Sequence, residues 1–161
     1  MATRLAKHAA EGALAGIAGT AALAGIILPA EKYLPDFHPP QAEDPGSFML
    51  WQAEKYLPRK TWVKIPRSAN TAAGFALSFG YGATFGLLYG LFRKRKPNIL
   101  IDGAALGLVT WAVGYLGWLP ATKLIPPPHK QTPAQLAGPI VEHIAYGIAT
   151  VATYQFLNKK W

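Results

Sequence analysis

Residues 12–30 read GALAGIAGTAALAGIILPA, a run without Asp, Glu, Lys, Arg or His. At 1.5 Å per residue, a helix of this length crosses the hydrocarbon core of a bilayer, which is about 30 Å thick. The helix of a water-soluble protein would carry a polar stripe recurring every three or four residues, and this run has no such stripe. The run therefore predicts a transmembrane helix.

Three more stretches extend this pattern along the chain. Residues 68–92 and 103–122 also lack charged residues and histidine, and residues 134–157 are interrupted only by Glu142 and His143. The mean hydropathy of +0.15 is modest because Ala and Gly dilute the apolar runs and polar residues crowd into the connections. We predict an all-α membrane protein, one domain over residues 1–161, with four transmembrane helices at about 10–29, 70–92, 99–120 and 134–157.

The first run could instead belong to a cleaved signal peptide, because Arg4 and Lys7 precede it. It is too long for that role, and Leu28-Pro29-Ala30 is a poor cleavage site, so we expect the first span to be retained. The chain has no cysteine, which excludes disulfides, thiolate metal sites and iron–sulfur clusters.

The net charge of +8 is distributed unevenly, which indicates an orientation. Basic residues precede the first span, close the last one at Lys159 and Lys160, and fill the short second connection. The positive-inside rule places these segments in the cytoplasm of a bacterial inner membrane, N-in and C-in, although five basic residues in the first connection oppose it. We interpret the second connection as a topology determinant rather than a nucleic-acid or lipid site; it consists of Arg93, Lys94, Arg95 and Lys96.

The long first connection, residues 31–69, is rich in aromatic residues and proline. Asp44-Pro45 is typical of an N-cap followed by proline at the first helical position, and Pro58 stops the helix that starts there. Phe48, Trp51 and Lys55 recur at helical spacing between them, so we expect an interfacial helix on the membrane surface.

An internal duplication links the two halves of the chain. Residues 11–35 align without a gap on residues 102–126, with nine identical positions, and an acidic residue opens each copy. The second and fourth spans also align, which pairs Tyr81-Gly82 with Tyr146-Gly147, Tyr89 with Tyr154 and Ser78 with His143. The chain therefore reads as a tandem, parallel repeat of a helical hairpin, whose first copy is enlarged by the surface loop.

The second span carries one small residue every four positions on one face: Gly74, Ser78, Gly82, Gly86 and Gly90. Small residues let helix backbones approach closely inside a membrane. The face predicts packing within the bundle, against the glycines of the first or third span, or a seam with a second copy or a partner subunit.

Glu142 and His143 are the ionisable residues deepest in a predicted span. Thr132 and Gln135 form a capping-box pattern at the start of this helix, so Glu142 lies about 12 to 15 Å along it. One interpretation is a proton relay or cation site in which His143 titrates near neutrality and Tyr146 is a hydrogen-bonding neighbour. The other is a polar clamp that ties this span to a neighbour.

The sequence offers little support for catalysis. The remaining histidines, His8, His38 and His129, fall in terminal or loop segments without the helical spacing of metal or haem ligands. No nucleophile constellation, phosphate loop or nucleotide fingerprint is present. We expect no enzyme activity, no metal and no cofactor.

The last span begins after a proline and continues as Glu-His, Tyr-Gly and a later Tyr; the second span repeats Tyr-Gly, and glycine opens the first and third spans. This pattern resembles the YagU-like small inner-membrane proteins of bacteria over nearly the whole chain. The resemblance implies a four-helix inner-membrane protein without an assigned enzymatic activity. In that pattern the second span also tends to carry a histidine, where this chain has Ser78, and this departure weakens a paired-histidine mechanism.

Two functions follow from these observations. We expect a non-catalytic membrane component, either an accessory subunit of a larger membrane complex or a self-associating bundle in the lipid bilayer. The alternative is a small channel or proton-coupled transporter that uses Glu142 and His143.

Overall fold

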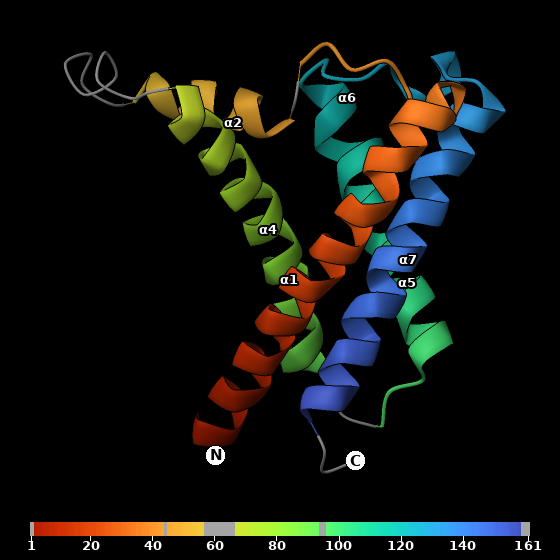
Figure 1. Cartoon of the computed structure of the whole chain (residues 1–161). Helices are drawn as coiled ribbons and strands as arrows, with labels where there is room; N and C mark the ends of the chain where they lie inside the picture. Colours follow the sequence, from red (N-terminus) through yellow and green to blue (C-terminus); the bar gives the residue numbers. More distant parts are fainter. Residues whose placement is uncertain (1, 44, 57–66, 94–95, 159–161) are drawn as a thin grey trace.

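The computed structural model describes residues 2–43, 45–56, 67–93 and 96–158, and every regular element in these ranges is helical (Figure 1). Both described ends of the chain lie at the same end of the bundle. In chain order the elements are α1 (Ala2–Tyr33), η1 (Pro35–Phe37), α2 (Pro45–Glu54), α4 (Arg67–Phe92), α5 (Ile99–Trp111), η2 (Ala112–Trp118), α6 (Leu119–Ala121), η3 (Pro128–Lys130) and α7 (Pro133–Leu157).

Three of the described helical segments are long and apolar enough to cross a membrane: Thr3–Tyr33, Gly74–Phe92 and Ile99–Ala121. They cover the first three predicted spans. Helix α1 starts at Ala2, before the predicted span, and this extension includes an i,i+4 ion pair between Lys7 and Glu11 at 3.4 Å. Helix α7 is not among the three, so its place across a membrane stays a prediction.

Helices α1 and α4 cross through glycines. A Cβ atom added to Gly16 would overlap the Gly82 carbonyl oxygen and lie 3.0 Å from the Ala83 Cα. One turn away, a Cβ at Gly86 would lie 2.7 Å from the Gly16 nitrogen. The two backbones therefore touch directly, as small residues allow inside a membrane.

Helices α5 and α7 cross in a similar way. A Cβ at Gly107 would overlap the His143 carbonyl oxygen and lie 2.7 Å from the Ile144 Cα. A Cβ at Gly147 would lie 2.6 Å from the Gly107 nitrogen. The contacts of the two crossings correspond when Gly86 of α4 is matched with Gly147 of α7. The sequence alignment instead matches Gly82 with Gly147, so the two pairings differ by one helical turn.

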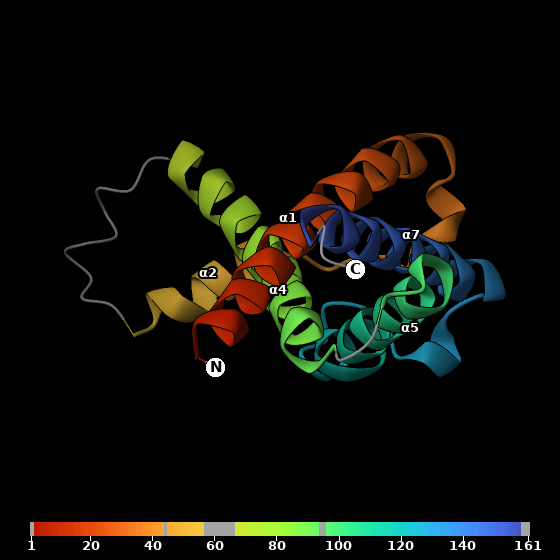
Figure 2. The same ribbon diagram turned by 90° about the horizontal axis from the view of Figure 1, so that it is seen from below.

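Helix α7 lies between α1 and α5, whereas α4 packs on α1 and α2 and diverges from the other helices (Figure 2). The bundle is therefore lopsided, with α7 as its most enclosed long helix. The rings of Tyr89 and Tyr154, which the sequence alignment pairs, meet edge to face at 5.4 Å between α4 and α7.

The first connection contributes two elements at the end of the bundle opposite the termini (Figure 1). Helix α2 begins at Pro45, as predicted, and packs against α4, where a Cβ at Gly46 would lie 2.8 Å from the Gly74 Cα. Asp44 and Pro58 lie outside the described residues. Whether α2 rests on a membrane surface stays a prediction.

The sequence predicted the start of α7 better than the local structure of the third candidate span. The capping box at the start of α7 is confirmed, because the Thr132 side chain accepts from the Gln135 N–H at 3.2 Å and the Gln135 side chain accepts from the Thr132 N–H at 3.0 Å. The third span changes to a π-helix over Ala112–Trp118, which the sequence pattern did not predict. Such wide turns are rare and local.

We expect Gly86→Leu to separate α1 from α4, because any side chain there meets the α1 backbone. Overpacking of this kind costs about 1–3 kcal/mol of unfolding free energy, measured by denaturant titration in detergent micelles. Gly25→Leu, on α1, is the matched control, since no atom lies within 4 Å of a Cβ there. Equal losses in the two variants would contradict the glycine crossing.

Candidate functional site

Helix α7 carries a buried polar side chain at every fourth position. We call this set the polar file; its exposed fractions are 4% for Glu142, 1% for Tyr146, 0% for Thr150, 0% for Tyr154 and 4% for Asn158. Residues four apart lie on one helix face, about 6 Å apart along the axis. The polar file therefore extends about 24 Å, most of the thickness of a bilayer core.

One end of the polar file is a hydrogen-bonded contact between His38 and Glu142. A glycine makes it possible, because a Cβ at Gly138 would overlap the Phe37 carbonyl oxygen. The segment after η1 therefore lies directly on α7, one turn before Glu142. There the His38 Nε2 atom lies 2.7 Å from the Glu142 Oε1 atom, and both side chains are almost fully buried.

Each member of this pair also keeps a second buried polar atom. Glu142 Oε2 and His38 Nδ1 have no hydrogen-bond partner among the described residues. Glu31 and His38 line an open cavity of about 290 Å³ beside the pair. The carboxylate is thus close to a route toward the surface at this end of the bundle.

The middle of the polar file is formed by Tyr146 and Thr150. The Tyr146 hydroxyl donates to the Gly82 carbonyl oxygen at 2.8 Å and so ties α7 to α4. Thr150 Oγ1 lies against Gly19 of α1 and has no hydrogen-bond partner among the described residues. A hydroxyl group can both donate and accept a hydrogen bond.

The other end of the polar file meets His8 of α1. The Tyr154 hydroxyl oxygen and the Asn158 side-chain amide nitrogen each lie 3.0 Å from His8 Nδ1. The Glu11 carboxylate lies 3.6 Å from the same nitrogen. Each end of the polar file therefore contains one histidine and one carboxylate.

His143 takes a different direction from Glu142, because successive side chains on a helix point about 100° apart. Its Nδ1 atom donates to the Pro139 carbonyl oxygen at 2.8 Å, and its ring meets Tyr115 edge to face at 5.5 Å. Sequence reasoning treated Glu142 and His143 as a pair, whereas the structure pairs Glu142 with His38.

The predicted packing face of α4 separates into three parts. Gly82, Gly86 and Gly90 lie against the backbone of α1, and Gly74 lies against Gly46 of α2. Ser78 is exposed and donates to the Gly74 carbonyl oxygen at 3.1 Å. Ser78 therefore lies away from the α1 contact.

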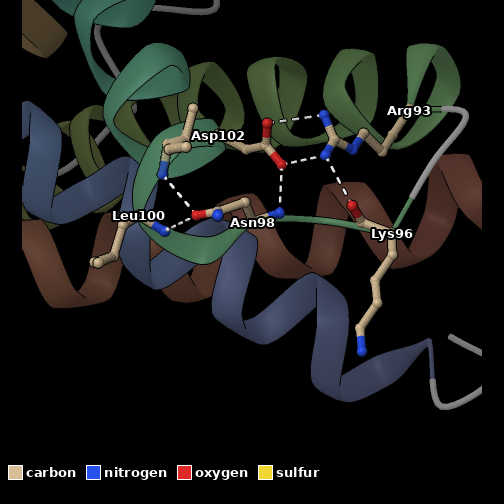
Figure 3. Close-up of polar contacts among 6 residues, drawn as sticks. Arg93, Lys96, Asn98, Leu100 and Asp102 are labelled. Carbon is tan, nitrogen blue, oxygen red and sulfur yellow. Dashed lines mark hydrogen bonds and ion pairs between the residues drawn. The ribbon is translucent and has the colours of Figure 1, made fainter.

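The basic connection between α4 and α5 contains a specific ion pair, shown in Figure 3. The Arg93 guanidinium binds both carboxylate oxygens of Asp102, at 2.8 Å for Oδ1, and donates to the Lys96 carbonyl oxygen at 3.1 Å. The second Asp102 oxygen accepts from the Asn98 N–H at 2.6 Å. Arg93 thus anchors the start of α5; Lys94 and Arg95 lie outside the described residues.

Sequence reasoning missed four residues of this site. His8 and His38 were set aside because they lie near the terminus and in a loop. Thr150 and Asn158 were overlooked, although their four-residue spacing after Glu142 was available as a signal. Only the folded chain brings the two histidines to the ends of the polar file.

A helical bundle with three membrane-length apolar segments and a buried polar helix face defines a small helical membrane protein. The chain belongs to DUF6789, a family of unknown function that matches residues 6–160. No curated protein and no solved structure matches the chain. These comparisons do not link it to the YagU-like proteins, so that resemblance stays a prediction.

Proposed function

We propose that α7 also crosses the bilayer, which makes four spans. With 25 residues it is about 37 Å long, and it runs beside α1 and α5 (Figure 1). Its lower hydropathy comes from side chains of the polar file, which are buried rather than lipid-facing. The matching glycine crossings and the Tyr89–Tyr154 contact support a tandem repeat of a helical hairpin.

We infer that the polar file carries protons across this bundle, as a small proton channel or as the proton path of a coupled transporter. The observation that carries this inference is the buried polar group at every fourth residue of α7. Ionisable residues inside a membrane are costly to keep, and chains of Glu, Asp and His mark proton relays in pumps and transporters.

The chemistry of the polar file suits proton transfer. Tyrosine and threonine hydroxyls each donate and accept a hydrogen bond, so a proton can enter on one side and leave on the other. Glu142 with His38 and Glu11 with His8 supply a titratable pair at each end. A purely structural clamp would need the hydrogen bonds but no group that titrates.

Glu142→Gln separates these two roles, because glutamine keeps the shape and a hydrogen bond to His38 but does not titrate. We expect purified wild-type protein in liposomes to conduct protons down a potassium-driven gradient, read with a pH-sensitive dye. Glu142→Gln should reduce the flux to that of protein-free liposomes. Val141→Leu is the matched control, since Val141 is adjacent and 65% exposed, and it should leave the flux unchanged. Equal flux in wild-type and Glu142→Gln liposomes would contradict the relay.

The proposed orientation places both termini in the cytoplasm of a bacterial inner membrane, in agreement with the basic residues around Arg93. A reporter that works only in the cytoplasm should be active when it is fused after Lys96 or after Asn158. A reporter that works only in the periplasm should be active when it is fused after Gln131. A periplasmic signal after Asn158 would show that α7 does not cross. A periplasmic signal after Lys96 would reverse the orientation.

A second candidate function is that of an accessory subunit, and the outer face of α4 favours it. Ala72, Ala76, Gly80 and Thr84 follow one another at four-residue spacing, and all are exposed because α4 diverges from α5. A second membrane helix with small residues fits such a face.

Cysteine cross-linking tests this candidate cleanly, because the chain has no native cysteine. The experiment combines Gly80→Cys with single cysteines introduced along the helices of candidate binding chains, either another copy or a partner subunit. If the face binds one of these helices, oxidation in native membranes should give a disulfide-linked product. Leu14→Cys, on an exposed part of α1, is the control and should give none. A Gly80→Cys variant that stays monomeric throughout would exclude this face as an interface.

A further inference from the structure

A second cavity, of about 450 Å³, lies at the end of the bundle opposite the termini and shares Pro40 and Gln41 with the cavity beside Glu142. Prolines form much of its wall, Leu124 and Ile125 give it an apolar side, and the two cationic side chains that line it are Lys123 and Lys130. None of its lining residues is acidic. The cavity therefore combines positive charge, apolar surface and stiff backbone.

Lys123 has an unusual backbone conformation. Its φ of 62° makes it the one non-glycine residue with positive φ in the described ranges. The Leu124 N–H donates to the Leu119 carbonyl oxygen at 3.0 Å, and the Lys123 N–H donates to the Pro120 carbonyl oxygen at 3.1 Å. This is a Schellman motif at the end of α6, and its left-handed position is usually glycine.

A structural role does not account for a lysine at this position. A cation near the carboxyl end of a helix is favourable, but it gains that interaction anywhere in the last turn without a left-handed backbone. Glycine would close the same turn at lower conformational cost. The residue in this turn, Lys123, lines the cavity together with Lys130.

We propose that this cavity binds the phosphate group of an anionic phospholipid. The two ammonium groups would contact the phosphate, and the proline rings would contact the adjoining glycerol and acyl carbons. This inference rests on the proposed position of the bundle across a bilayer, which places α6 at the headgroup level, and it is independent of proton transfer. It also gives the lysines at this end a role, although the positive-inside rule disfavours them there.

The binding assay uses detergent-solubilised full-length protein titrated with phosphatidylglycerol or phosphatidylcholine and followed by tryptophan fluorescence. Wild-type protein should prefer phosphatidylglycerol. Lys123→Gly should weaken that binding about fivefold, and Lys123→Gly with Lys130→Gln about 25-fold, since each lysine near an anionic lipid contributes a similar increment. Lys32→Gln, an exposed lysine of α1 near the same end, is the control and should bind as the wild type does.

The glycine variant also separates binding from folding. Because glycine suits the turn, Lys123→Gly should unfold at the same temperature as the wild type or higher while it loses lipid affinity. Unchanged phosphatidylglycerol affinity, or loss of stability together with affinity, would overturn the proposal. Inorganic phosphate at millimolar concentration should not displace the lipid; if it does, the site is a free-phosphate site and the lipid assignment is wrong.

Discussion

Burial of the Glu142 carboxylate is the interaction on which the rest of this structure depends. A carboxylate inside an apolar bundle is costly unless it is paired and hydrogen-bonded. The chain supplies a partner for one oxygen, Oε1, by bending after α1, so that η1 returns across the end of α7 and places His38 2.7 Å from Glu142. Gly138 permits that return because its missing side chain leaves room for the Phe37 carbonyl group. The loop, the glycine and the His38–Glu142 contact therefore form one unit.

The glycine crossings explain why the polar residues gather on α7. Where α1 meets α4 and α5 meets α7, the backbones touch, and large side chains have no room between them. The tyrosines of α7 fill the space that remains between the two hairpins, where Tyr146 reaches Gly82 and Tyr154 reaches His8. Polar contacts between hairpins thus complement apolar contacts within them, which is how membrane bundles combine close packing with interhelical hydrogen bonds.

The sequence predicted what depends on local composition and spacing. Runs without charge located three membrane-length helices, and Thr132 with Gln135 located the start of α7. The sequence did not predict contacts between residues that are far apart in the chain. His38 and Glu142 are 104 positions apart, and His8 and Tyr154 are 146 positions apart. Adjacency in sequence was misleading for Glu142 and His143, because helical geometry turns them toward different neighbours. The sequence alignment paired Tyr89 with Tyr154 as equivalent positions without predicting that their rings meet, and it missed the one-turn shift between the glycine crossings.

Whether protons can pass along α7 is tested most directly by an experimental structure in a lipid mesophase at a resolution that shows ordered water. The polar file should then face the centre of a transmembrane bundle. Water should link the Glu142 carboxylate, the Tyr146 and Thr150 hydroxyls and the His8 end in one hydrogen-bonded chain. A dry stretch of apolar side chains between Glu142 and Tyr154, or an α7 that lies along the membrane surface, would contradict the proposed path.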